Sequence, residues 1–342
     1  MRVRATVRRD TPEKTKHLRR LPHAAERLEI VELDLVKSSA ADFERAVSGC
    51  TLVAHTASPF IVSGVSEQDL IKPAVEGTLS VLRAVATPAG ANVRKVVVTS
   101  SVASVSAGYS PAEEDAHGPF SEKDWSKVET AQPYPKSKTL AERAAWEFWR
   151  SLGPSPTWSL CTVNPSFVQG PSITPDAGTS VDIMRRLLGR EMPMVPATAF
   201  SCVDVRDVAE AHLRALTLPR EATEGRRFIV AHDTLLFSEM GVVLRDEFAP
   251  AGYHPPTVTM PKWLAHVAAV FVPDLRGLLP GWGRKGATYD VAPSRDVLGI
   301  QYHDVKESVR LAGYSAVYHG LVPKKPALKL KWVPPGVSDA QQ

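Results

Sequence analysis

A continuous apolar run at Lys95–Thr99 (KVVVT) limits the folds open to this chain more than any other segment. Runs of this kind form strands that are buried on both faces of a parallel sheet. The strand-like ranges are Val3–Val7, Leu28–Leu33, Thr51–His55, Lys95–Thr99, Leu160–Asn164 and Arg227–Val230. Helix-like ranges separate them at Glu13–Leu21, Ser39–Val47, Leu70–Ala86 and Lys136–Arg150. Because strands that alternate with helices pair in parallel, the sequence predicts an α/β fold with a doubly wound parallel sheet.

Composition excludes several classes of protein. The chain has 342 residues, 44% of them hydrophobic, and 41 basic against 37 acidic side chains, which is typical of a globular protein. The charge is spread along the chain, so we expect no nucleic-acid partner. Cys50, Cys161 and Cys202 form no CxxC pair, which predicts no metal site and reduced thiols in the cytoplasm. The apolar run Trp263–Val272 is about half a membrane span, so we expect a buried helix and no membrane partner.

Two short motifs bring together the residue types that proton transfer to a carbonyl oxygen requires. Ser100 and Ser101 follow the strand Lys95–Thr99, so we expect them at the carboxyl end of the sheet, where ligands bind in open α/β folds. Tyr134 and Lys138 are spaced to project from one helical face. A phenol titrates at about pH 10, and an ammonium nearby lowers its pKa. With a serine hydroxyl to hold the oxygen, these residues predict a proton-transfer device for a carbonyl/alcohol pair.

These motifs also carry a family resemblance. The region of resemblance extends from Val3 to about Val322. The segments that carry it are ATVRRD, HTASP (His55 to Pro59), VVVTSSVASV, YPKSKTLAERAAWEFW, VNPSFVQGP, VDVRDVAEAH and RRFIVA. The chain resembles the extended short-chain dehydrogenases/reductases of the NAD-dependent epimerase/dehydratase superfamily. Within them it is most similar to the branch of dihydroflavonol and cinnamoyl-CoA reductases. The resemblance implies a Rossmann-like sheet and a smaller C-terminal substrate-binding domain.

The resemblance and the change in texture after Pro165, where Pro, Gly, Ser and Thr become frequent, predict the domains. We expect a dinucleotide-binding domain over residues 1–169, completed by 200–232. Residues 170–199 and 233–342 would form the substrate-binding domain. Phe200–Leu216 is expected to be helix-like, with Asp204 capping the helix.

The resemblance further implies roles for single residues. Tyr134 would donate the proton in carbonyl reduction, Lys138 would bind the nicotinamide ribose and tune Tyr134, and Ser101 would hold the substrate oxygen in preference to Ser100. The remaining implied cofactor contacts are Asp34 and Leu35 beside the adenine, Thr56, Ala57 and Ser58 after a strand, Pro165, Ser166, Phe167 and Val168 near the nicotinamide, and Ser180.

A basic cluster follows the first strand, at the position where this fold places the adenosine ribose. An acidic residue there binds the 2′-hydroxyl of NAD, whereas an arginine accommodates the 2′-phosphate of NADP. Arg8 and Lys14 therefore predict NADP(H) as the cofactor, with NAD as the alternative.

One element of the family is missing from the sequence. No glycine-rich turn stands upstream of Val3, although such a turn lets the backbone approach the pyrophosphate at a helix N-terminus. We expect that a strand-turn-helix unit of about 30 residues is absent, through a misplaced start or a truncation. Its loss would leave neighbouring strands unpaired.

The sequence predicts an NADP(H)-dependent oxidoreductase that reduces a ketone or aldehyde carried on a small hydrophobic molecule. Tyr134 stands in AQPYPKSK, not in the NWYCYGK segment of cinnamoyl-CoA reductases, which disfavours a CoA thioester. The alternatives are a sterol-type dehydrogenase or nucleotide-sugar epimerase on the same fold, and a non-catalytic relative. Trp263, Phe271 and Trp282 are candidate pocket walls, although the core is the expected place for each.

Overall fold

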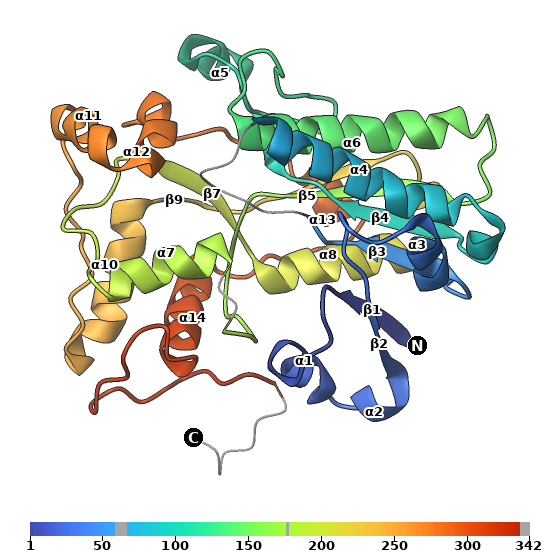
Figure 1. The fold of residues 1–342 in the computed structure, drawn as a ribbon. Helices are drawn as coiled ribbons and strands as arrows, with labels where there is room; N and C mark the ends of the chain where they lie inside the picture. The colour runs from blue at the N-terminus through green and yellow to red at the C-terminus, as the bar shows by residue number, and fades with distance from the viewer. Residues whose placement is uncertain (59–66, 176–177, 336–342) are drawn as a thin grey trace. The chain divides into compact units, whose positions relative to one another are not determined.

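The computed structural model describes residues 1–58, 67–175 and 178–335, which form two compact units (Figure 1). The first unit contains Met1–Pro165, Glu210–Val230 and Tyr289–Ile300. The second contains Ser166–Ala209, Ala231–Thr288 and Gln301–Gln342. Compared with the expected domains, the division falls before Ser166 instead of after residue 169. Residues 200–209 group with the second unit, and Tyr289–Ile300 returns to the first.

The first unit is built on parallel strands, as the sequence predicts. Strands β3 (Leu52–His55), β4 (Lys95–Thr99), β5 (Ser159–Pro165) and β8 (Arg227–Val230) form one sheet in the order β3-β4-β5-β8, with every pair parallel. Strands β1 (Val3–Val7) and β2 (Leu28–Glu32) form a separate parallel pair. Val96, Val97 and Val98 of β4 are buried, which matches the continuous apolar run.

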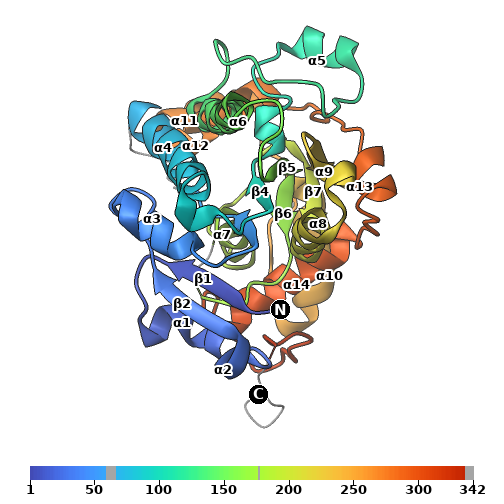
Figure 2. The ribbon, with the colours of Figure 1, turned by 90° about the vertical axis from the view of Figure 1, so that its right-hand side faces the viewer.

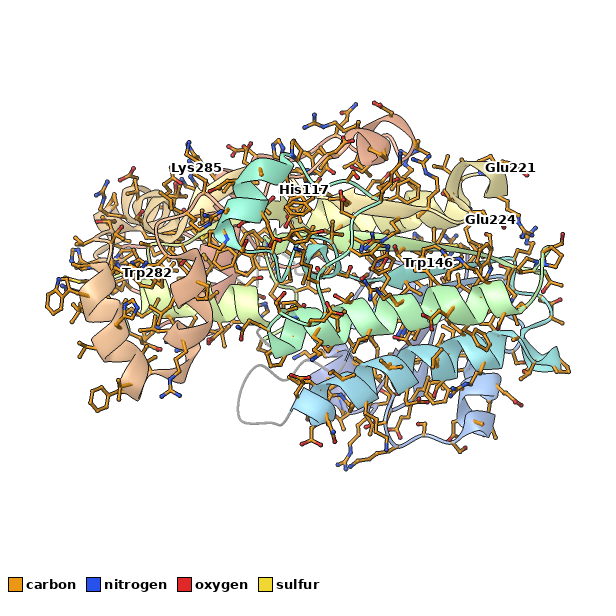
Figure 3. The ribbon with its side chains drawn as sticks, turned by 90° about the horizontal axis from the view of Figure 1, so that it is seen from above. His117, Trp146, Glu221, Glu224, Trp282 and Lys285 are labelled. Carbon is orange, nitrogen blue, oxygen red and sulfur yellow. The ribbon has the colours of Figure 1, made fainter. Side chains whose placement is uncertain are left out.

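Helices cover both faces of the four-stranded sheet (Figure 2). On one face α3 (Ala40–Val47), α4 (Glu67–Val85) and α6 (Pro133–Ser151) enclose a core that includes Phe43, Leu82 and Trp146. Helices α4 and α6 run side by side, with Trp146 on α6 (Figure 3). On the other face α8 (Val205–Thr217) contacts β4, where Thr99 Oγ1 lies 2.6 Å from His212 Nε2. The predicted doubly wound arrangement is therefore present.

Shorter elements complete the first unit. Ser39 caps α3 through a capping box with Asp42, which explains why the helix starts there. The remaining elements are α1 (Pro12–Arg19), α2 (Ala24–Arg27), η1 (Pro88–Gly90), η2 (Val102–Ser104), α5 (Pro111–His117), α9 (Arg220–Thr223) and α13 (Ala292–Asp296).

A cavity of about 1170 Å³ lies beside the strand edges of the first unit, lined by β1 and β3 and by side chains of α3, α4 and α8. Among the described residues, β1 pairs only with β2, and β3 pairs only with β4. The expectation that Thr51–His55 is a buried strand is wrong for most of its length. Ala54 is exposed and Leu52 is half-buried, because one edge of β3 faces the cavity.

This arrangement predicts unequal local stability. Amides of β1 and β2 should exchange with solvent at least about 100-fold faster than those of β4 and β5, because a two-stranded pair opens at lower free energy than a sheet covered on both faces. Hydrogen–deuterium exchange of peptides from Val3–Val7 and Lys95–Thr99 measures the difference. Equal protection of the two peptides would contradict it.

The second unit contains a smaller mixed sheet. Strand β7 (Ala199–Asp204) pairs in parallel with β6 (Phe167–Gln169) and antiparallel with β9 (Thr234–Leu236). Its core is formed by α7 (Thr179–Leu188), α10 (Phe237–Phe248) and α14 (Val305–Tyr318). The helix expected at Phe200–Leu216 is therefore wrong in its first part, because cross-strand pairing places Phe200–Asp204 in β7. Asp204 Oδ1 accepts the Arg206 backbone N–H at 2.7 Å, as a cap of α8 would.

One prediction about the second unit, the burial of its apolar helix, is wrong. Helix α11 (Lys262–Phe271) forms where the apolar run predicts it, but Trp263 is 70% exposed and Phe271 is 80% exposed. The predictions of a buried helix and of core positions for these two side chains are wrong, whereas Trp282 is buried. Helix α12 (Pro273–Leu278) follows, with η3 (Ala249–Ala251) and η4 (Leu279–Gly281) nearby in sequence. None of the helices that the structure describes is long and apolar enough to cross a membrane.

Candidate active site

Helix α6 presents the two predicted functional side chains at its amino-terminal end. Pro133 and Pro135 stand in the first turn, where a missing N–H costs no hydrogen bond. Tyr134 and Lys138 follow one turn apart, and both are half-buried. The structure therefore places them on one face, as the spacing predicts.

The serine turn lies at the carboxyl end of β4. Ser100 N–H donates to Val163 O at 2.8 Å, which extends the contact between β4 and β5 beyond Thr99. Ser101 is the N-cap of η2, and its Oγ accepts the Ala103 N–H at 3.1 Å. The Ser101 side chain also lies close enough to Tyr134 to lower the pKa of its phenol. The structure thus brings Ser101 and Tyr134 together, whereas the Ser100 hydroxyl points to Glu142.

The electrostatics differ from the expectation in one respect. The sequence predicts that Lys138 lowers the pKa of Tyr134, but burial raises the pKa of this phenol, and the hydrogen bond with Ser101 only partly opposes it. Burial also lowers the pKa of Lys138 to about 8, against the opposing charge of Glu142. At neutral pH, Tyr134 therefore carries its proton and most Lys138 side chains carry their charge.

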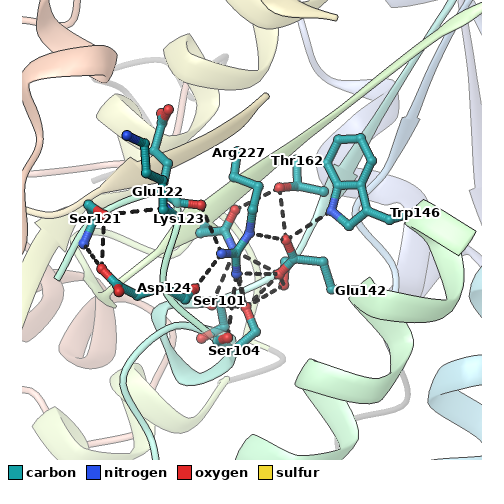
Figure 4. A network of polar contacts seen from close by, with 12 residues as sticks. Ser101, Ser104, Ser121, Glu122, Lys123, Asp124, Glu142, Trp146, Thr162 and Arg227 are labelled. Carbon is teal, nitrogen blue, oxygen red and sulfur yellow. Dashed lines mark hydrogen bonds and ion pairs between the residues drawn. The ribbon is translucent and has the colours of Figure 1, made fainter. Parts of the chain in front are cut away.

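A buried ionic network lies next to these residues and was not predicted from the sequence (Figure 4). Glu142 Oε1 accepts from Arg227 Nε at 2.6 Å, and both side chains are buried. Trp125 stacks on the guanidinium, with 3.8 Å between Arg227 Cζ and the ring centroid. Glu142 continues the four-residue spacing of Tyr134 and Lys138, which was the one sequence signal available for it.

Strand β3 contributes a buried histidine to the same region. His55 Nε2 lies 3.3 Å from Thr78 Oγ1 on α4. Burial, with a smaller effect of the Lys138 charge, lowers the pKa of His55 to about 4. After His55, Thr56 and Ala57 are exposed and Ser58 is half-buried, while Pro59 of the HTASP motif lies outside the described residues.

This histidine predicts a pH dependence of stability. Its pKa is 6.5 when unfolded and about 4 when folded, so its contribution is complete above pH 6.5 and is lost as the pH falls towards 4. We expect the wild type to lose about 3 kcal/mol more of its free energy of unfolding across this window than His55→Gln does. Urea unfolding at a series of pH values measures this. His254→Gln, at an exposed histidine, is the matched control, and parallel pH profiles for wild type and His55→Gln would refute the assignment.

The residues predicted for the adenosine end lie on β1, β2 and the segments that follow them. Asp34 Oδ1 accepts the N–H groups of Val36 at 2.8 Å and Lys37 at 3.1 Å. The Val36 bond keeps the pKa of Asp34 below its usual value, and Lys37 and Arg8 add to the effect. Arg8 is exposed, and its charge acts on Asp34.

The two other residues predicted at this end are placed separately. Leu35 packs close to Gly77 of α4, where a Cβ on the glycine would lie 3.3 Å from Leu35 Cβ. Lys14 is exposed on α1.

The predicted nicotinamide contacts fall on both sides of the division between the units. Pro165 is the last residue of β5 in the first unit. Ser166, Phe167, Val168 and Ser180 belong to the second unit, with Phe167 and Val168 in β6 and Ser180 half-buried in α7. Ser166 Oγ is buried and has no hydrogen-bond partner among the described residues, so it is available to a ligand.

Two side chains of the candidate site fit NADP(H), one at the ribose and one at the 2′-phosphate. Lys138 donates no hydrogen bond to any residue that the structure describes, so its ammonium can bind ribose hydroxyls, and Arg8 offers an exposed guanidinium. The described residues offer no comparable fit for the pyrophosphate of the dinucleotide. Within residues 1–58 and 67–175, no glycine-rich turn joins a strand to a helix.

Comparisons with known proteins identify the family of the chain. The model of the NAD dependent epimerase/dehydratase family matches residues 1–231. Tetraketide alpha-pyrone reductase 1 of Arabidopsis thaliana is 34% identical over 256 residues, which cover 73% of this chain and 72% of the relative. Cinnamoyl-CoA reductase CAD2 of Medicago truncatula is 35% identical over 252 residues, covering 71% and 72%.

A solved structure shows the same fold. Gre2 of Candida albicans, crystallised in complex with NADPH, superposes with a TM-score of 0.73 and is 27% identical, with 93% of this chain and 92% of that chain covered. The family model and the curated relatives together show that the chain belongs to the NAD-dependent epimerase/dehydratase family.

Proposed function

We propose that this protein is an NADP(H)-dependent oxidoreductase that reduces a ketone or an aldehyde to an alcohol, in the manner of the dihydroflavonol reductase branch. The observation that carries the proposal is the proximity of the Ser101 hydroxyl to Tyr134, with Lys138 one turn further along α6. Membership of the family supports the proposal, because two of the similar proteins are named as reductases. Small hydrophobic carbonyl compounds are the proposed substrates.

The residues divide the reaction between them. A dinucleotide held by these residues would supply the hydride that reduces the carbonyl carbon. Ser101 and Tyr134 donate hydrogen bonds to the carbonyl oxygen, and Tyr134 then transfers its phenolic proton to that oxygen as negative charge develops there. The Lys138 ammonium would bind the nicotinamide ribose, and the Ser101 hydroxyl would stabilise the phenolate that Tyr134 leaves behind.

The remaining predicted residues would hold the cofactor. Arg8 and Lys14 would bind the 2′-phosphate, with Asp34 and Leu35 at the adenine. Further contacts would come from Thr56, Ala57, Ser58, Pro165, Ser166, Phe167, Val168 and Ser180.

Arg8 provides a test of cofactor choice. Because a charge-assisted bond to the 2′-phosphate is lost, Arg8→Ala should raise the KM for NADPH by about 10- to 100-fold and change the KM for NADH by less than about twofold. Initial rates with each cofactor measure this. Arg94→Ala removes an exposed arginine just before β4, at the opposite end of the strand from Ser101, and should change neither KM. An equal change in both KM values for Arg8→Ala would refute the assignment.

The function itself is tested by NADPH oxidation by the 342-residue chain, with methylglyoxal as an aliphatic carbonyl and acetophenone as an aromatic ketone. Turnover of either one supports the proposal. NADPH binding without oxidation across such carbonyl compounds would contradict it, and NAD retained through purification would indicate an epimerase instead. We further propose a cytoplasmic location with no nucleic-acid or membrane partner, because Cys161 and Cys202 are buried free thiols and the charge is spread along the chain.

A further inference from the structure

A buried carboxylate contacts the serine turn of the candidate site (Figure 4). Glu142 Oε2 accepts hydrogen bonds from Ser100 Oγ and Ser104 Oγ, each at 2.5 Å, and from Asn164 Nδ2 at 2.9 Å. The Glu142 side chain is 0% exposed. A charge buried to this extent is costly unless it is paired and hydrogen-bonded, so the surrounding structure must be built around it.

Two of the residues that bind Glu142 also hold the backbone of Ser101. Ser101 O accepts the backbone N–H of Ser104 at 3.0 Å, and Asn164 Nδ2 lies 3.3 Å from the same oxygen. The carboxylate therefore fixes the residues that fix Ser101. A shift of this turn would move the Ser101 hydroxyl away from Tyr134.

The charge of Glu142 is secured by its partners. Burial alone would raise its pKa, but the charge of Arg227 and hydrogen bonds from Arg227, Ser100 and Ser104 hold the pKa below its usual value. Glu142 stands one turn after Lys138 on α6, and its negative charge opposes the effect of burial on the pKa of Lys138. The other titratable groups around Glu142 and Lys138 are Tyr134 on α6, His55 on β3 and Glu122. Burial raises the pKa of Glu122, although Arg226 and Arg227 oppose this effect.

We propose that Glu142 is a positioning residue for carbonyl reduction: its carboxylate holds the Ser100–Ser104 turn that orients Ser101, and it supplies the counter-charge for the Lys138 ammonium. This inference rests on the proposed function. Glu142 itself does not touch the reacting atoms, so its effect is transmitted through Ser101 and Lys138.

The effect of the Glu142 charge on Lys138 can be tested without measuring turnover. Titration of the Lys138 ammonium is followed by NMR of labelled lysine side chains, with its signal assigned from Lys138→Arg. In Glu142→Gln the pKa of Lys138 should fall by about 1 unit below the wild-type value. Glu147→Gln removes an exposed carboxylate from the same helix and should leave the titration unchanged.

The positioning is tested by kinetics. Glu142→Gln should lower kcat by about 10- to 100-fold while the KM for NADPH changes by less than about threefold, because Ser101 is displaced and the cofactor contacts remain. Activity should also decline with rising pH at lower pH values than in wild type, since Lys138 loses its proton earlier. A purely structural role would reduce activity only in proportion to the folded fraction and would leave the pH profile in place.

A second variant covers the case in which Glu142→Gln fails to fold because the Arg227 charge is left unpaired. Glu142→Gln with Arg227→Met removes both buried charges and should fold. It should show the same decrease in the pKa of Lys138, because Arg227 is not among the groups that shift it.

The outcomes separate this inference from the proposed function. An unchanged Lys138 titration in the folded variants overturns the charge role, and a wild-type kcat in Glu142→Gln overturns the positioning role. If the wild type itself does not oxidise NADPH, the proposed function fails and the reaction role of Glu142 fails with it, while the lysine titration still decides whether the two charges are coupled.

Discussion

Tyr134→Phe is expected to lower kcat for carbonyl reduction by about 10²- to 10⁴-fold, the usual contribution of a positioned general acid. Phenylalanine keeps the ring and its packing but removes the phenolic proton that α6 offers next to Ser101. Binding of NADPH should stay within about threefold of wild type, because Lys138 and Arg8 are unchanged. Steady-state rates and fluorescence titration of NADPH measure the two quantities separately.

The control for this variant is another tyrosine of the same unit. Tyr109 donates its hydroxyl to Trp125 O at 3.2 Å and has no proposed role in the reaction, so Tyr109→Phe should retain wild-type kcat. Retained turnover in Tyr134→Phe would refute the role of Tyr134 as proton donor. A parallel loss in both variants would instead indicate a general effect of removing a tyrosine hydroxyl in this unit.

Arg227→Ala is expected to lower the free energy of unfolding by about 3–5 kcal/mol, because it leaves the Glu142 carboxylate buried without its charge partner. Besides Glu142, the guanidinium donates to Glu122 O at 3.0 Å and to Asp124 O at 2.5 Å, so the loop before α6 also loses its anchor. Urea unfolding monitored by tryptophan fluorescence measures the loss, since Trp125 stacks on this side chain.

The neighbouring arginine is a matched control. Arg226 Nη2 lies 3.4 Å from Glu122 Oε2 and its side chain is 35% exposed, so Arg226→Ala should cost at most about 1 kcal/mol. The double variant Glu142→Gln with Arg227→Met should be more stable than Arg227→Ala, because no unpaired charge remains. Equal losses for Arg226→Ala and Arg227→Ala would mean that the buried pair does not stabilise the fold.

Much of the candidate site could be predicted from local sequence patterns. The spacing of Tyr134 and Lys138 is a property of any α-helix, and a serine that follows a buried strand reaches the carboxyl end of a sheet wherever that strand is placed. Glu142 could have been found by the same spacing. Its partner could not, because Arg227 is 85 residues away in the chain and only the pairing of β5 with β8 brings it close.

Other features could not be predicted from the sequence, because they depend on contacts with residues that lie far away in the chain. Phe200–Asp204 has helix-like spacing, yet it pairs with β6 and β9 as a strand. Trp263 and Phe271 of α11 are exposed because no element among the described residues covers them, whereas Ala265 and Ala269 on the same helix are buried. Exposure of Ala54 results from an edge of β3 that faces a cavity instead of another strand.

By itself, the sequence determined the α/β class, the parallel strands and the helical face that carries Tyr134 and Lys138, since these depend on periodicities of two to four residues. The tertiary structure decided how those side chains ionise. Burial, which only packing creates, raises the pKa of Tyr134 and lowers that of Lys138. The Glu142 charge acts on Lys138 because Arg227, Ser100 and Ser104 hold the carboxylate ionised. Desolvation and charge pairing act through space, so the chemistry of these residues was fixed by the fold.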